Sequence, residues 1–139
     1  MSDSITKPSV LIVDDDPVML EVISEILKRS LADVLVDITD SPDTALRRAA
    51  SHQYSAVVTD VIMPGMNGLE LAARIHAIRP NTHIVFMSGT AHALENCRLR
   101  AFACLPKPFD IETFTDTVRS AVASSPPSSA RMGDAPIEP

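Results

Sequence analysis

The sequence predicts an α/β fold in one domain, with a five-stranded parallel sheet covered by helices on both faces. Two observations predict it. Short runs of apolar and β-branched residues, typical of strands buried on both faces, alternate along the chain with segments of helical periodicity. The chain also has 139 residues, which is the usual length of one domain. Strands that alternate with right-handed helical crossovers form a parallel sheet.

Five segments are expected to form strands, and four of them are continuous runs of mainly apolar residues. The second segment differs because Val34, Val36 and Ile38 alternate with other residues, which indicates a strand with one buried face. The expected strands are residues 10–13, 34–38, 56–60, 84–87 and 102–105.

Five helices are expected to connect and follow these strands. Asp16 before Pro17 and Ser41 before Pro42 each combine a capping side chain with a proline suited to the first helical position. Asp110 is expected to cap the last helix, and a short fourth helix is expected in residues 91–99. The apolar faces of the other four helices are Met19, Ile23, Ile26 and Leu27; Ala45, Leu46 and Ala49; Leu71, Ile75 and Ile78; and Ile111, Phe114, Val118 and Val122.

Composition indicates the domain limits and the cell compartment. Residues 1–8 are expected to be a leader, residues 9–123 the folded domain, and residues 124–139 a disordered tail, because four Ser and four Pro there bury little apolar area. The start of the chain has no apolar signal core, and no apolar run reaches transmembrane length. We therefore expect a cytoplasmic protein, without membrane association, in which Cys97 and Cys104 stay reduced. The net charge of −6 argues against nucleic-acid binding by this domain.

Polar side chains stand at the ends of four of the expected strands. Asp14 and Asp15 follow the first strand, Asp60 ends the third, Ser88 follows the fourth and Lys107 comes just after the fifth. Each of them alone has an ordinary explanation, as a helix cap, a turn residue or a solvated surface residue. The carboxyl ends of parallel strands meet at one edge of the sheet, however, so these residues are expected to converge on one cleft.

The charge of this group predicts its chemistry. Two carboxylates about 4 Å apart repel by roughly 4 kcal/mol at an effective dielectric constant of ~20, so the cluster requires a cation. Lys107 supplies one positive charge, and a divalent ion that prefers oxygen ligands, Mg²⁺ or in its place Mn²⁺, supplies the rest. Such a site suits phosphoryl transfer, and a carboxylate nucleophile forms an acyl phosphate.

Four motifs resemble the receiver domains of two-component response regulators. They are VLIVDDDP at residues 10–17, VTDVIMPGMNGLEL at residues 58–71, MSG at residues 87–89 and KPF at residues 107–109. The resemblance covers about residues 8–123 and implies a flavodoxin-like (βα)₅ three-layer sandwich with strand order 2-1-3-4-5. It also implies a phosphorelay protein whose partner is a sensor histidine kinase or a histidine phosphotransfer protein. No catalysis is expected beyond the domain's own phosphorylation and dephosphorylation.

The resemblance assigns roles residue by residue. It implies that Asp60 is the phosphoacceptor, that Asp15 binds Mg²⁺ directly and Asp14 through water, and that the main-chain carbonyl of Ile62 is a further ligand. Ser88 would donate a hydrogen bond to a phosphoryl oxygen and Lys107 would pair with another. The bond between Lys107 and Pro108 is cis in the family.

Three departures from the family concern the usual output surface, not the phosphorylation site. Cys104 stands where the family usually has an aromatic ring, and Arg100 stands where glycine is common. The segment from Ser88 to Lys107 is a few residues short, so the fourth helix is expected to be curtailed.

Two other functions are compatible with parts of the sequence. Asp14-x-Asp16-x-Val18 fits the nucleophile motif of haloacid-dehalogenase-type phosphohydrolases, although no acidic pair follows Lys107 and no cap domain is present. In that enzyme Asp14, and not Asp60, would become phosphorylated. The other alternative is a pseudo-receiver that docks partners without phosphotransfer. The kinase, the output module and the oligomeric state are left open by the sequence.

Overall fold

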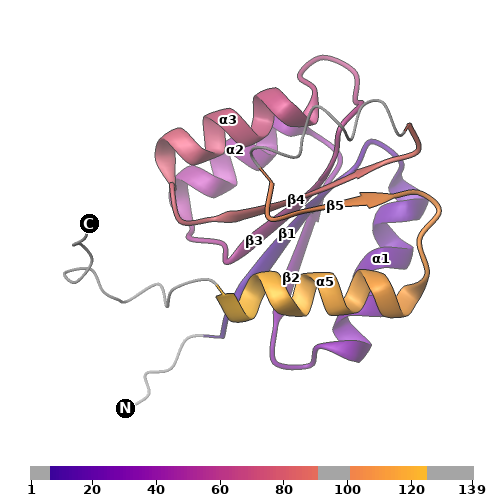
Figure 1. Cartoon of the computed structure of the whole chain (residues 1–139). Coiled ribbons are helices and arrows are strands. Elements are labelled where there is room, and N and C mark those ends of the chain that lie inside the picture. Colours follow the sequence, from indigo (N-terminus) through magenta and orange to yellow (C-terminus); the bar gives the residue numbers. More distant parts are fainter. Residues whose placement is uncertain (1–6, 91–100, 125–139) are drawn as a thin grey trace, which may run out of the picture.

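Five parallel strands in the order β2-β1-β3-β4-β5 form the centre of the molecule (Figure 1). The computed structural model describes residues 7–90 and 101–124. The predicted flavodoxin-like fold and strand order are therefore confirmed. The elements are β1 (Ser9–Val13), α1 (Pro17–Ser30), β2 (Leu35–Thr39), α2 (Pro42–Ser51), β3 (Ala56–Asp60), α3 (Gly68–Ile78), β4 (His83–Ser88), β5 (Ala103–Pro106) and α5 (Ile111–Ser124).

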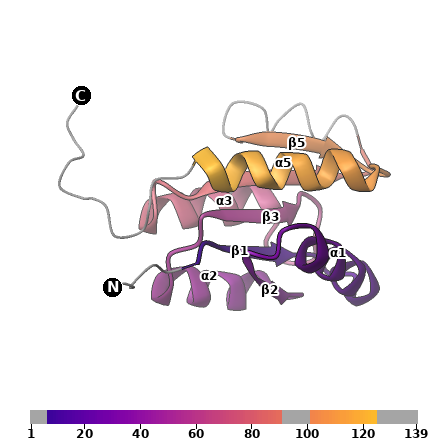
Figure 2. The same ribbon diagram turned by 90° about the horizontal axis from the view of Figure 1, so that it is seen from below.

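Helices cover both faces of the sheet, with α2 and α3 on one face and α1 and α5 on the other (Figures 1 and 2). Side chains of one strand alternate between the two faces. In β1, for example, Leu11 and Val13 belong to the core under α2 and α3, whereas Val10 and Ile12 belong to the core under α1 and α5. This double burial explains why the strand sequences are continuous apolar runs.

Capping side chains begin the helices where the sequence predicted them. The carboxylate of Asp16 accepts hydrogen bonds from the main-chain N–H groups of Val18 and Met19, and the hydroxyl of Ser41 accepts one from Thr44. At α5 the carboxylate of Asp110 accepts a hydrogen bond from the N–H of Thr113, which holds the pKa of Asp110 below its usual value.

Three residues assigned to buried faces are exposed. Ile38 is 37% exposed because β2 is the edge strand of the sheet, with β1 as its only neighbour. Ile78 and Ile111 are 44% and 59% exposed, and they are the last residue of α3 and the first of α5. A helix end lacks the covering turn that a central position has, so an apolar residue there is buried less.

Other expectations fall outside the described residues. They are the short fourth helix in residues 91–99, the residues Cys97 and Arg100, most of the leader, and the tail after residue 124. Among the described residues, no helix is long and apolar enough to cross a membrane.

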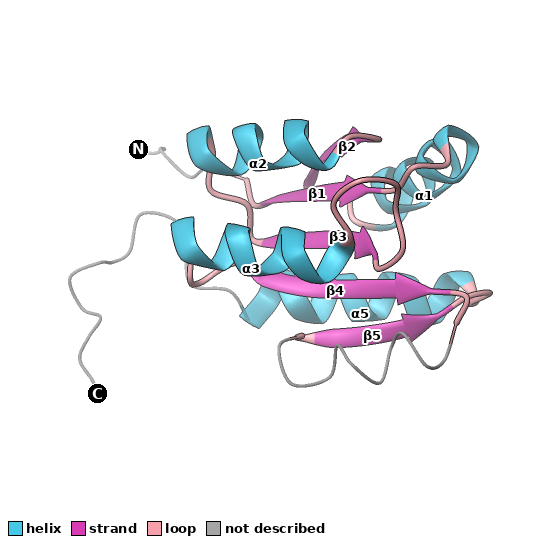
Figure 3. Cartoon of the chain, turned by 90° about the horizontal axis from the view of Figure 1, so that it is seen from above, coloured by secondary structure: helices cyan, strands magenta, loops and turns pink. Residues whose placement is uncertain are grey.

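All five strands point in one direction, so their carboxyl ends share one edge of the sheet (Figure 3). The register places Val13 beside Thr59, and Asp60 beside Met87. The residues that follow β1 and end β3 are therefore neighbours in space, and these are the aspartates that the sequence singled out.

Candidate functional site

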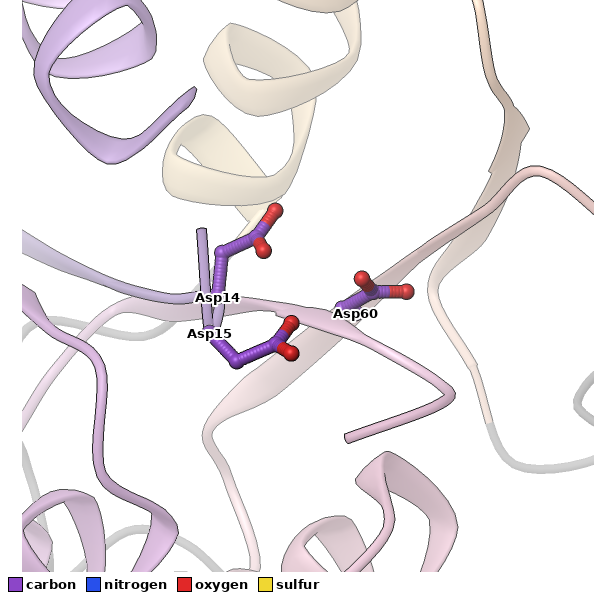
Figure 4. A group of neighbouring side chains, drawn as sticks. All are labelled: Asp14, Asp15 and Asp60. Carbon is purple, nitrogen blue, oxygen red and sulfur yellow. The ribbon is translucent and has the colours of Figure 1, made fainter. Parts of the chain in front are cut away.

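Three carboxylates from two strands form a cluster at this edge. One ligand oxygen from each of Asp14, Asp15 and Asp60 lies within 4.8 Å of the other two. Figure 4 shows their side chains gathered at the ends of β1 and β3. Asp14 is buried, Asp60 is half-buried and Asp15 is exposed. The predicted convergence of these three residues is confirmed.

Asp14 is held by contacts to both of its carboxylate oxygens. Oδ1 accepts a hydrogen bond of 3.0 Å from the N–H of Asp16, and Oδ2 pairs with the ammonium of Lys107 at 3.1 Å. The side chain is only 1% exposed. Burial raises the pKa of Asp14 above its usual value, although the hydrogen bond from Asp16 and the pairing with Lys107 oppose the shift.

Lys107 joins two of the three carboxylates. Its Nζ atom lies 3.1 Å from Asp14 and 3.3 Å from Oδ2 of Asp60. Burial alone would lower the pKa of Lys107, but the hydrogen bonds and charges of Asp14 and Asp60 outweigh it, and the pKa is raised. The bond between Lys107 and Pro108 is cis, as the resemblance implied.

Ser88 lies at the same edge, at the end of β4. It is 2% exposed, and its hydroxyl oxygen accepts a hydrogen bond of 3.0 Å from the N–H of Thr90. The main-chain N–H of Lys107 donates to the carbonyl of Ser88 at 2.8 Å, so the backbones of the two residues are directly joined. The hydroxyl is therefore positioned by its own loop, beside β5, and Lys107 directly follows that strand.

The loop between β3 and α3 closes tightly on Asp60. Asn67 caps α3, and the N–H of Gly68 donates to the carbonyl of Val61 at 2.7 Å. A Cβ atom on Gly68 would collide with the main-chain carbonyl of Asp60 and with Cα of Val61. Ile62, whose carbonyl was expected to be a metal ligand, lies in this loop with its side chain 59% exposed.

The donor set fits a hard divalent cation. Mg²⁺ binds oxygen atoms at about 2.0–2.1 Å in octahedral geometry, which places neighbouring ligand oxygens about 3 Å apart and opposite ones about 4 Å apart. The spread of the three carboxylates allows both spacings. Among the described residues, no hydrogen bond or ion pair neutralises the Asp15 carboxylate, so the cluster keeps a negative charge that such an ion would offset.

Asp16 is the member of the acidic triplet that does not join the cluster. Its carboxylate is exposed and is used in capping α1. The phosphohydrolase motif requires Asp14 and Asp16 in one site, and the two side chains have different surroundings here. The structure thus supports the assignment of Asp16 as a cap.

Sequence reasoning missed two features of the site. It expected Lys107 to supply a positive charge to the cluster and to pair with a phosphoryl oxygen, but it did not name buried Asp14 as a direct partner. It also gave no role to Gly68; the signal for it was the Asn67–Gly68 pair that ends a turn-rich loop.

A doubly wound α/β domain with a carboxylate cluster and a lysine at its strand ends belongs to the class of α/β proteins whose functional site lies at this edge of the sheet. Comparison with known proteins identifies the family. Residues 10–119 match the family described as "Response regulator receiver domain". The chain therefore belongs to the response regulator receiver family.

Relatives and solved structures agree with this assignment. The chain is 35% identical over 130 residues to the DNA-binding transcriptional regulator NtrC of Azospirillum brasilense, covering 91% of this chain and 27% of that protein. It is 31% identical over 133 residues to the response regulator protein FleR of Pseudomonas aeruginosa, covering 94% and 28%. The response regulator TrrA of Thermotoga maritima, solved in complex with Mg²⁺ and BeF, is 25% identical with a TM-score of 0.75, covering 82% of this chain and 98% of that one.

The family defines the general function. Receiver domains of two-component systems are phosphorylated on an aspartate, by histidine kinases, and their role is regulatory. The acidic cluster resembles the Mg²⁺ site of such domains. The chain spans about a quarter of the length of the NtrC relatives, so the activities of those whole proteins are not carried over to it.

Proposed function

We propose that Asp60 is the residue that accepts the phosphoryl group, in a reaction that requires Mg²⁺. The observation that carries this proposal is the position of Asp60 at the end of β3. Its carboxylate faces Asp14 and Asp15 there and pairs with Lys107. It is half-buried, so a phosphoryl donor can reach it, whereas Asp14 is enclosed.

In the proposed reaction a carboxylate oxygen of Asp60 attacks the phosphorus of a phosphohistidine on a sensor histidine kinase or a histidine phosphotransfer protein. The new O–P bond forms as the N–P bond breaks, and the histidine nitrogen leaves with its electron pair. Lys107 and the hydroxyl of Ser88 are assigned to the phosphoryl oxygens. Both residues lie at the edge of the sheet where the carboxyl ends of the strands meet.

Asp14, Asp15, Asp60 and the carbonyl of Ile62 are assigned to the metal site. When bound, Mg²⁺ neutralises phosphoryl oxygens as charge moves onto them, and Mn²⁺ is expected to substitute because it also prefers oxygen ligands. Asp15 has no competing protein contact among the described residues, which supports its assignment as the direct ligand.

We further propose that residues 9–123 form the receiver unit, acting in the cytoplasm and not binding nucleic acid by itself. The family match over residues 10–119 supports these limits of the receiver unit. The net charge of −6 supports the absence of nucleic-acid binding by this domain. The domain catalyses only changes in its own phosphorylation in this proposal.

The test is intact-mass measurement after treatment with acetyl phosphate, with and without Mg²⁺. We expect addition of one phosphoryl group only with Mg²⁺, and none in Asp60→Asn. Asp16→Asn is the matched control, because Asp16 is an exposed neighbouring aspartate outside the cluster, and it is expected to be labelled like the unmodified chain. Label on Asp14 would support the phosphohydrolase alternative, and no label with any donor would support a pseudo-receiver.

A further inference from the structure

Asn67 is the only asparagine of the sequence that is followed by glycine, whereas Asn81 and Asn96 precede residues with side chains. Asparagine is a thermolabile residue, and a glycine after it leaves its amide open to attack by the next main-chain nitrogen. In that reaction the nitrogen of Gly68 loses its proton and bonds to Cγ of Asn67, and ammonia leaves. Water then opens the five-membered succinimide ring at either carbonyl, which gives aspartate or isoaspartate.

The fold engages both reacting groups in hydrogen bonds. The N–H of Gly68, which would have to lose its proton, donates to the carbonyl of Val61 at 2.7 Å. The side-chain oxygen of Asn67 caps α3 by accepting from the N–H of Glu70 at 2.9 Å. The carbonyl of Asn67 accepts the N–H of Leu71 at 3.0 Å. Ring closure would break the first two of these bonds and strain the third.

The space around Gly68 restricts the reaction as well. Gly68 is buried, and an added Cβ atom there would collide with the main chain of Asp60 and Val61. A rigid ring at the nitrogen of Gly68 therefore requires this backbone to move. Asn67 itself is exposed, so water reaches its side chain. The local geometry, and not exclusion of water, is what opposes the reaction.

We propose that Asn67 is a deamidation site controlled by the fold: the first turn of α3 holds it unreactive, and opening of the loop between β3 and α3 lets it convert. Aspartate at this position is as good a helix cap as asparagine, and its charge is favoured at a helix N-terminus. Isoaspartate instead places its own Cβ in the main chain, which moves Gly68 away from Val61 and against Asp60. Only isoaspartate therefore disrupts the site.

The first test compares deamidation of the folded chain with that of the chain unfolded in urea, at the same mildly alkaline pH. Peptide mapping measures the asparagine, aspartate and isoaspartate forms of residue 67. Because the reaction requires an opened loop, Asn67 is expected to convert at least about tenfold faster in urea. Asn81 in the same maps controls for the effect of urea on the chemistry and is expected to change little in either condition. Equal rates for Asn67 in the two conditions overturn the inference.

A pair of variants separates opening of the loop from unfolding of the whole domain. Met63 anchors the loop in the core under α2 and α3 and is 6% exposed. Met63→Ala is expected to speed deamidation of the folded chain by at least about tenfold. Leu27→Ala removes a buried side chain from the opposite core, and its rate is expected to stay within about threefold of the unmodified chain. Equal acceleration by both variants overturns control by the loop.

Hydrogen exchange of the unmodified chain measures the same opening if Met63→Ala does not fold. The N–H of Gly68 is expected to be protected, because it donates to Val61. Fast exchange of this N–H, as in an unfolded chain, overturns the inference.

The second test compares the two products after chromatographic separation. The aspartate form, and Asn67→Asp as its matched variant, are expected to melt like the unmodified chain. The isoaspartate form is expected to melt several degrees lower and to be labelled more slowly on Asp60 by acetyl phosphate. Equal melting of the two products overturns the inference. If the unmodified chain takes no label, the proposed function is refuted, while the deamidation rates and the melting temperatures still test this inference.

Discussion

Gly68 offers a direct test of how tightly the site depends on the loop between β3 and α3. A methyl group at this position would meet the carbonyl carbon and oxygen of Asp60 and Cα of Val61. All of these are main-chain atoms, so no side-chain rotation relieves the collision. The backbone has to move, and the atoms that move belong to the proposed phosphoacceptor.

Two opposing effects determine the stability of Gly68→Ala. Overpacking of a tight site costs about 1–3 kcal/mol. Alanine is favoured over glycine by up to about 1 kcal/mol inside a helix, and by less here because Gly68 is the first residue of α3. The collision prevails, and we expect a net loss of about 1–2 kcal/mol. For a chain of this size that corresponds to a fall in melting temperature of several degrees.

Two other glycines provide matched controls. Among the described residues, a Cβ atom on Gly89 would have no atom within 4 Å apart from its chain neighbours, and the backbone there is one that any residue adopts. Gly89→Ala is therefore expected to change stability by less than about 0.5 kcal/mol. Gly65 also has open space but a φ of 81°, so Gly65→Ala should cost about 1 kcal/mol through backbone strain alone. The assays are thermal unfolding and the rate of labelling of Asp60 by acetyl phosphate. Of the three variants, only Gly68→Ala is expected to show both a lower melting temperature and slower labelling because of a collision with the backbone of Asp60. A Gly68→Ala variant as stable and as readily labelled as Gly89→Ala would refute the reasoning.

Two further predictions concern the metal and the response to phosphorylation. Asp15→Asn is expected to weaken Mg²⁺ binding more than Asp14→Asn, while Asp14→Asn costs about 1–3 kcal/mol of metal-free stability by breaking the pair with Lys107. Mg²⁺ titrations measure the two affinities, and thermal unfolding without metal measures the stability of Asp14→Asn. Weaker Mg²⁺ binding by Asp14→Asn than by Asp15→Asn would refute the assignment of Asp15 as the direct ligand. Cys104 stands where the family usually has an aromatic ring, so it has no ring that could change position on phosphorylation. Amide shifts caused by Mg²⁺ and beryllofluoride are therefore expected to concentrate in residues 62–67 and 89–92. Dominant shifts across β5 and the start of α5 would show that the ring is dispensable.

The fold was predictable because burial on both faces leaves a plain pattern in the sequence. Continuous apolar runs indicate strands between two helical layers, and the cores on both sides of β1 agree with this. The strand order came from the family resemblance, since periodicity does not tell which strand is at an edge. Ile38 is exposed because β2 is such an edge strand, and the alternation of Val34, Val36 and Ile38 alone does not show this.

The location of the site was predictable for a different reason: its residues oppose stable folding. Apolar strands that end abruptly in carboxylates place like charges together, and folding alone does not favour that arrangement. Gly68 could not be found in this way, because a glycine after a turn is consistent with ordinary local structure. Only the closeness of its backbone to Asp60 reveals its importance.

The acidic triplet shows what the sequence alone does not predict, which is the different role of each of three adjacent aspartates. Asp14, Asp15 and Asp16 are identical and adjacent, yet the first is buried and paired with Lys107, the second is exposed and faces the cluster, and the third caps α1. The sequence does distinguish Asp16 from the other two, because the proline that follows it is suited to the first position of a helix, which marks Asp16 as the cap of α1. The sequence does not distinguish the first two; in the fold, Asp14 accepts a hydrogen bond from the N–H of Asp16 and pairs with Lys107, which follows β5. The pairing of Lys107 with Asp14 joins residues 93 positions apart, so the division of roles within the triplet is a property of the fold and not of the motif.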